Sequence, residues 1–118
     1  NIVPLAVYQG YLGLSLKDKI YNIQSTNHDD HVTIVASGHL NWKARECLRE
    51  VFIRSLDSEK NLVIDGKFIT FVDSAVLGSL IQMKRVMNSR GLSFTIQALP
   101  RSVQRLMEFN NIKGYLIP

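Results

Sequence analysis

The sequence predicts an α/β domain in which helices pack on a small mixed β-sheet. Apolar, β-branched segments alternate with segments of helical periodicity, in the order β-β-α-β-α-β-α. Only turn residues separate the first two strand segments, which indicates an antiparallel hairpin. From the second strand on, each strand is followed by a helix, which implies parallel neighbours joined by crossovers. With 118 residues, 46% of them hydrophobic, the chain has enough apolar material for one core.

The hairpin is predicted near the start of the domain. Residues 20–24 alternate between apolar and polar side chains, and residues 25–30 (STNHDD) are turn formers. Residues 31–37 (HVTIVAS) are rich in β-branched residues, and Gly38 is expected to end this second strand.

The first helix is expected to begin after Asn41, whose side chain is suited to capping a helix N-terminus. Residues at helical spacing predict its buried stripe: Ala44, Cys47, Leu48, Val51, Phe52 and Ser55. The polar side is expected to hold Arg45, Arg49, Glu50 and Arg54.

Two further strand–helix units complete the prediction. Residues 61–73 (NLVIDGKFITFVD) contain two apolar pieces separated by a predicted break at Asp65-Gly66, and Gly91 is a candidate C-cap for the helix that follows. That helix has an apolar stripe of Leu77, Leu80, Ile81 and Met87. Residues 92–99 predict the last strand, and Pro100 opens a helix with an apolar face of Val103, Leu106 and Met107.

Residues 1–18 are treated as an N-terminal extension, and residues 19–118 as the domain. Apolar residues of the extension follow no single period, and Gly10 and Gly13 interrupt any helix. The extension is too short to cross a membrane and lacks the basic start of a secretory signal. The chain begins with Asn1, so we expect a cut or processed chain. The apolar opening is compatible with a homodimer.

Composition excludes several classes of function. The 14 Lys and Arg residues outweigh 10 Asp and Glu, but they are scattered, so no nucleic-acid partner is expected. No apolar run reaches the length of about 18 residues typical of a membrane span, so direct membrane insertion is not expected. The single cysteine, Cys47, forms no internal disulfide and is interpreted as a buried helix residue, which fits the reducing cytoplasm.

The densest titratable cluster, residues 28–31 (HDDH), has two interpretations. A His-x-x-His spacing with two carboxylates is suited to a metal ion, but the cluster lies in a predicted hairpin turn, which is the favoured interpretation. Around Ser74 the sequence VDSAV lacks the glycines of a hydrolase elbow, and no phosphate-binding G-x-x-x-x-G-K loop is present. No catalytic residue, metal or cofactor is therefore predicted.

Asp73 and Ser74 lie where a strand passes into a helix. Either residue is a good N-cap, and capping alone is sufficient to account for the pair. The junction also lies at the carboxyl end of the sheet, where open α/β sheets place their functional groups. A serine at this position is expected to be accessible.

Residues 61–112 resemble the STAS domain of bacterial anti-sigma-factor antagonists. The matching motifs are Asp65, then residues 73–75 (DSA) and 77–78 (LG), then Gly91 and the strand and helix after it. Upstream, residues 32–41 (VTIVASGHLN) are similar to the family's strand ending in Gly-x-Leu-Asp/Asn. The resemblance covers about residues 20–118. Val76 departs from it, because the family has glycine there, at the helix start that a partner or kinase approaches.

The resemblance implies a STAS fold and a non-enzymatic phosphorylation switch. In such antagonists the serine after the aspartate, here Ser74, is phosphorylated by a partner that is both anti-sigma factor and serine kinase, of the histidine-kinase-like ATPase type. The unphosphorylated form binds this partner, and phosphorylation releases it. The expected contact surface comprises Gly38, Leu40, Asn41, Asp73, Ser74, Gly78, Ser79, Gln82 and Arg85.

Two other functions stay open at this point. STAS domains also serve as interaction modules in sensor complexes, anion transporters and lipid-transport machines. The missing initiator methionine and the unmatched extension favour such a module, whereas a phosphorylatable Ser74 favours the switch. The third function is an enzyme or small-ligand binder on a similar α/β scaffold, because a fold alone does not fix function.

Overall fold

The computed structural model describes residues 21–109 and residue 116, so the predicted extension at residues 1–18 lies outside the described residues. The predicted order of elements is confirmed. The elements are β1 (Tyr21–Asn27), β2 (His31–Leu40), α2 (Trp42–Leu56), β3 (Asn61–Val72), α3 (Ser74–Ser89), β4 (Phe94–Gln97) and α4 (Arg101–Phe109).

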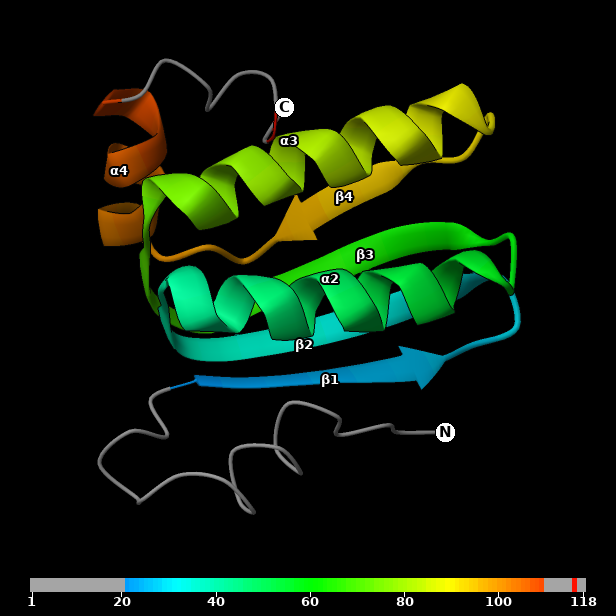
Figure 1. Cartoon of the computed structure of the whole chain (residues 1–118), viewed down its shortest axis with the longest axis horizontal. Coiled ribbons are helices and arrows are strands. Elements are labelled where there is room, and N and C mark those ends of the chain that lie inside the picture. The colour runs from blue at the N-terminus through cyan, green and yellow to red at the C-terminus, as the bar shows by residue number, and fades with distance from the viewer. Residues whose placement is uncertain (1–20, 110–115, 117–118) are drawn as a thin grey trace.

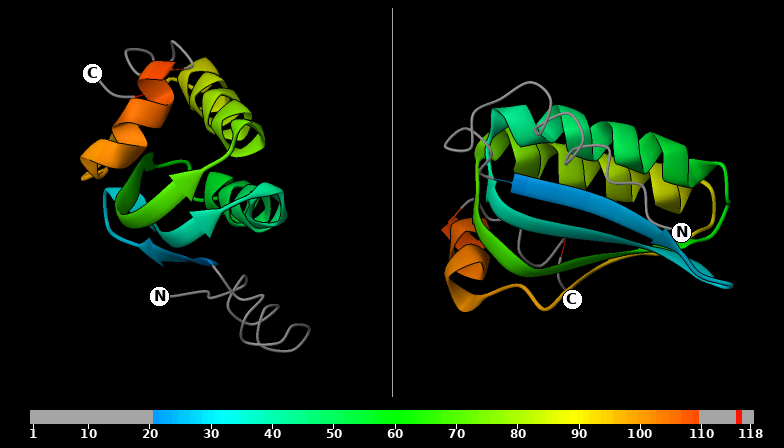
Figure 2. Two further views of the ribbon diagram at one scale, coloured as in Figure 1. Left: turned by 90° about the vertical axis from the view of Figure 1, so that its left-hand side faces the viewer. Right: turned by 90° about the horizontal axis from the view of Figure 1, so that it is seen from below.

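The four described strands form one mixed sheet in the order β1-β2-β3-β4. β1 is antiparallel to β2, whereas β2, β3 and β4 are parallel to one another. α2 and α3 lie side by side over one face of the sheet, and α4 packs near the carboxyl end of β3 (Figures 1 and 2). This arrangement is the predicted small α/β domain with helices packed on a mixed sheet.

The core lies between the sheet and its helices. Alternate residues of β2 and β3, including Val32, Ile34, Leu62 and Ile64, are buried there. Their neighbours in sequence, such as Thr33, are only half-buried on the other face. All five apolar residues predicted for the buried stripe of α2 are buried: Ala44, Cys47, Leu48, Val51 and Phe52. In α3 the buried residues are Val76, Leu77, Leu80, Met83 and Met87.

Two strand boundaries differ from the prediction. Residues 25–27 belong to β1, so the turn is confined to residues 28–30, because this part of the segment pairs with residues 32–34 of β2. Gly38 does not end β2, which continues to Leu40 through a register shift between Gly38 and His39. Gly38 accommodates this irregularity with a φ of 88°, a value that glycine adopts readily.

The predicted break at Asp65-Gly66 is wrong, because β3 runs unbroken through it. Opposite residues 35–37 of β2, β3 carries one extra residue, so the Asp-Gly pair marks a β-bulge within a strand. Gly66 is buried, and a Cβ at this position would lie 2.6 Å from Cδ2 of Leu99. A larger residue would have to displace the buried Leu99 side chain, so close packing against the segment after β4 favours glycine here.

Candidate functional site

The candidate site lies at one edge of the sheet, where two neighbouring parallel strands end. Leu40 of β2 pairs with Val72 of β3, and the backbone N–H of Asp73 donates to the carbonyl oxygen of Leu40 at 3.1 Å. α2 and α3 therefore both begin at this edge and run in the same direction along the sheet (Figure 1). Their N-termini bring partial positive charge to this end of the molecule.

α2 is capped by Asn41, as predicted, and of the two candidate caps for α3 the structure uses Asp73. The Asn41 side chain accepts from the N–H groups of Lys43 and Ala44, at 3.0 and 3.2 Å. The Asp73 carboxylate accepts from the N–H of Val76 at 2.9 Å. Both side chains are half-buried, and their oxygens accept hydrogen bonds from the first turns of the helices. Their role at this edge of the sheet is therefore structural.

Ser74 is the first residue of α3 and is exposed. Capping falls to Asp73, and no described residue hydrogen-bonds to the Ser74 hydroxyl. The serine therefore has no structural task at the helix start. The residue is open to solvent.

Val76, the residue that departs from the resemblance, points inward. Its side chain is 0% exposed and belongs to the core. The valine therefore adds no bulk to the surface around Ser74, and the approach to the hydroxyl stays open. A glycine at this position would remove packing from the core beneath the helix start.

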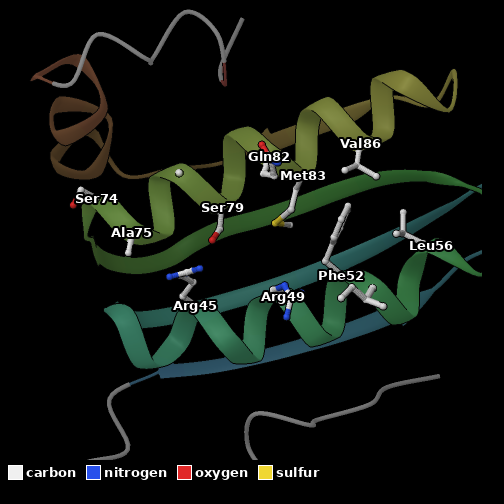
Figure 3. Close-up of a pocket in the computed structure, with 12 residues that line it drawn as sticks. Arg45, Arg49, Phe52, Leu56, Ser74, Ala75, Ser79, Gln82, Met83 and Val86 are labelled. Atoms are coloured by element: carbon white, nitrogen blue, oxygen red, sulfur yellow. The ribbon is translucent and has the colours of Figure 1, made fainter.

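A groove of about 470 Å³ separates α2 from α3 (Figure 3). Facing rows of residues at helical spacing line it. From α2 these are Arg45, Arg49, Phe52, Ile53 and Leu56, and from α3 they are Ser74, Ala75, Gly78, Ser79, Gln82, Met83 and Val86. Polar and basic side chains gather at the end where the helices begin, and aliphatic ones at the other end (Figure 3).

The structure brings four of the predicted contact residues together along this groove: Ser74, Gly78, Ser79 and Gln82. Arg85 is exposed but does not line the groove. Asn41 and Asp73 directly follow the ends of β2 and β3, whereas Gly38 lies within β2, and none of the three lines the groove. The prediction that Leu40 contacts a partner is wrong, because its side chain is 1% exposed and packs in the core.

Sequence reasoning missed the contribution of α2. Arg45 and Arg49 were assigned only to a polar side, yet they line the basic end of the groove. Ile53 is 47% exposed and Leu56 is half-buried, so the aliphatic end is open to solvent. Ile53 lies outside the predicted buried stripe of α2, and this position could have indicated a second apolar surface on the helix.

The cluster at residues 28–31 behaves as a turn. The N–H of His28 donates to the carbonyl of His31 at 2.8 Å, and Lys60 donates to the carbonyl of His28. Oδ1 of Asp30 lies 2.7 Å from Nδ1 of His31, and this hydrogen bond lowers the pKa of the Asp30 carboxyl. Within the described ranges, no three potential metal ligands lie close enough to hold an ion.

Cys47 is 4% exposed, which confirms that it is a buried helix residue. Its sulfur lies 3.3 Å from the Tyr21 hydroxyl. Burial raises the pKa of the Cys47 thiol, and burial together with the Cys47 contact raises the pKa of the Tyr21 hydroxyl. Both groups are thus held in their neutral forms, which is unsuited to a nucleophile.

Of the helices that the structure describes, none has the length and apolarity to cross a bilayer.

Fold and site together define a small α/β domain with an exposed serine at the carboxyl edge of its sheet and an interhelical groove beside it. The chain belongs to the STAS domain family, because a family model described as "Mlab, STAS domain" matches residues 23–118. No curated protein sequence is significantly similar to the chain.

Several solved structures share the fold at low sequence identity. An anti-sigma factor antagonist from Mycobacterium paratuberculosis superposes with a TM-score of 0.72 at 16% identity, covering 81% of this chain and 82% of that one. The antagonist SpoIIAA in its unphosphorylated form gives 0.69 at 15% identity, covering 80% and 85%. The protein TM1081 of Thermotoga maritima gives 0.68 at 19% identity, covering 78% and 75%. This chain is therefore similar in fold to anti-sigma factor antagonists.

Proposed function

We propose that this STAS domain is a cytoplasmic, non-enzymatic protein-binding switch controlled by phosphorylation of Ser74. The unphosphorylated domain binds an anti-sigma factor that is also a serine kinase of the histidine-kinase-like ATPase type. Transfer of the γ-phosphoryl group from ATP to the Ser74 hydroxyl releases that partner. The observation that carries the proposal is an exposed hydroxyl without a structural partner among the described residues, directly after the cap of α3.

The electrostatics of the helix start support a switch that leaves the fold intact. A phosphate adds about −1.5 to −2 charges at pH 7. At a helix N-terminus a negative charge is stabilising by about 0.3–1 kcal/mol, so the modified domain stays folded. In an interface the same charge must be desolvated or placed near partner carboxylates, which costs about 3 kcal/mol or more. Each 1.4 kcal/mol is about tenfold in affinity, so release follows.

The test is phosphorylation of the domain by a serine-specific ATPase of this type encoded by a neighbouring gene. The chain is incubated with the kinase and ATP, and modified peptides are mapped by mass spectrometry. One phosphate is expected, at Ser74, and Ser74→Ala should abolish it. Ser102→Ala is the matched control, because Ser102 is an exposed serine near the start of α4 and does not line the groove, so its loss should not affect modification.

Binding is measured in the same system. Ser74→Glu is expected to weaken binding of the kinase at least tenfold, whereas Ser74→Ala should bind like the unmodified domain. A Ser74→Glu protein that binds as tightly as wild type would contradict the switch. An active kinase that adds no phosphate would contradict it independently.

A second candidate function is that of an interaction module in a larger sensor, transporter or lipid-transport assembly. The family model favours this alternative, because it is described as an MlaB STAS domain rather than as an antagonist. Such a module would bind its partner through the same edge without modification. Equal binding by Ser74→Ala, Ser74→Glu and wild type, with no phosphate added, is the outcome that selects it.

A further inference from the structure

We propose that the groove between α2 and α3 binds an amphipathic partner helix whose apolar residues fill the aliphatic end and whose carboxylates face Arg45 and Arg49. This inference deepens the proposed function, because the groove ends at Ser74 and the bound helix would belong to the partner. It concerns the chemistry of the contact, and it holds for an unmodified domain in the absence of any kinase.

The dimensions of the groove fit a short helix. Its lining on α3 runs from Ser74 to Val86, and at a rise of about 1.5 Å per residue this spans about 18 Å. A helix of about three turns has that length. Two side-by-side helices leave between them a channel that takes anchors at i, i+3/i+4 and i+7, the pattern of helix-in-groove recognition.

The aliphatic end supplies the apolar contact. Phe52 and Met83 are buried beneath the groove and form its floor. Ile53, Leu56 and Val86 stand along its rim and remain at least partly exposed. Exposed aliphatic residues gathered around a buried floor mark a binding surface more than scattered apolar residues do.

The polar end supplies charge selectivity. Arg45 and Arg49 line it, and no lining residue is acidic. Arg49 has one weak partner, the exposed carboxylate of Glu46 at 4.0 Å, and no described residue forms an ion pair with Arg45. The N-terminus of α2, which is capped by the neutral Asn41, adds positive potential at the same end, whereas the Asp73 carboxylate offsets that of α3. Partner carboxylates are therefore favoured there, and a basic helix is disfavoured.

The experiment is a selection of helical peptides on the full chain. A phage library of 14-residue amphipathic helices is panned on unmodified protein, and enriched peptides are measured by fluorescence polarisation. We expect enriched sequences with apolar anchors at helical spacing and Asp or Glu at one end. Ile53→Glu and Arg45→Glu should each weaken binding at least tenfold. Replacing the peptide's acidic residues by Lys should restore binding to the Arg45→Glu protein.

The matched controls are Arg54→Glu on the same helix and Arg105→Glu on α4, which lie outside the groove and should change affinity less than twofold. All variants are first shown to melt like wild type. The inference is overturned if no helical peptide is enriched, if enriched peptides show no preference for acidic residues, or if the controls lose as much affinity. It is also overturned if wild type is dimeric and Ile53→Glu makes it monomeric, because the groove is then occupied by a second copy. The kinase is absent throughout, so failure here leaves Ser74 phosphorylation to its own test.

Discussion

Replacing Asp73 by alanine separates the capping role of this residue from the functional role proposed for Ser74. The Asp73 carboxylate accepts one hydrogen bond, from the N–H of Val76 at 2.9 Å. Because the Val76 side chain is fully buried, water has restricted access to the N–H that the mutation leaves unpaired. Loss of an N-cap costs about 0.5–2 kcal/mol, and this geometry places Asp73→Ala at about 1–2 kcal/mol.

The measurement is equilibrium unfolding in urea, supported by thermal melts. For a domain of this size, 1 kcal/mol corresponds to about 3–6 °C in Tm. Asp73→Asn is the matched variant, because asparagine caps as well as aspartate and keeps an acceptor oxygen; it should cost about 0.5 kcal/mol or less. If Asp73→Asn and Asp73→Ala lost the same stability, the carboxylate would act through its charge and the hydrogen-bond argument would be refuted.

Three further predictions concern charge, packing and pH. Ser74→Glu should change the free energy of unfolding by less than about 1 kcal/mol in urea titrations. Its loss of affinity for the peptide or the kinase should become smaller in about 1 M salt, where the Debye length is about 3 Å. A loss of affinity that does not depend on salt would indicate a steric cause. Gly66→Ala should lower the free energy of unfolding by about 1–3 kcal/mol, because the added Cβ meets the Leu99 side chain. Gly78→Ala should raise it by about 0.5–1 kcal/mol, because nothing lies within 4 Å of the added Cβ and alanine favours the helix. Equal effects of the two substitutions would contradict the packing argument. Because the pKa values of Cys47 and Tyr21 are raised in the folded state, the unfolded chain releases these protons at lower pH than the folded chain does. The free energy of unfolding should therefore decrease as the pH rises above about 8.5. The double variant Cys47→Ala/Tyr21→Phe should show a smaller decrease.

The sequence predicts the order of elements because each carries a strong local signal. β-branched runs, helical periodicity, the Asn41 and Asp73 caps, and the glycine after α3 all indicate the same boundaries. Gly91 has a φ of 74°, and the N–H of Leu92 donates to Met87, so the predicted C-terminal glycine does end the helix. Local and tertiary preferences agree in these places.

Prediction fails where pairing between distant residues decides the outcome. Asp65-Gly66 has the composition of a turn, but its neighbours pair with β2 on both sides, so the extra residue is absorbed as a bulge. The Asp65 side chain holds the bulge by contacting the N–H and the amine of Lys67, both at 3.2 Å. Only the register of the partner strand distinguishes these two structures.

The groove was beyond sequence reasoning for a related reason. Periodicity identifies the buried stripe of one helix, but a groove needs the facing row of another helix and their relative direction. α2 and α3 begin at the same sheet edge, so Arg45 comes to lie at the same end as Ser74, although the two are far apart in sequence. No pattern within either helix contains that relation. The contact surface predicted from α3 and the strand ends therefore lacked the α2 side of the groove.

The two proposals meet in the charge at the polar end of the groove. Asn41 and Asp73 carry out the capping, so charge can change at Ser74 without loss of the helix starts. A carboxylate docked near Arg45 would lie close to a phosphate on Ser74. At roughly 6 Å and an effective dielectric of about 20, each pair of unit charges repels by about 3 kcal/mol before screening. The phosphate would also attract the arginines that the carboxylate needs, so modification would weaken the attraction while adding repulsion. If the groove selects acidic helices, phosphorylation of Ser74 can therefore release the bound helix. If the groove does not select for charge, phosphorylation would not cause release in this way.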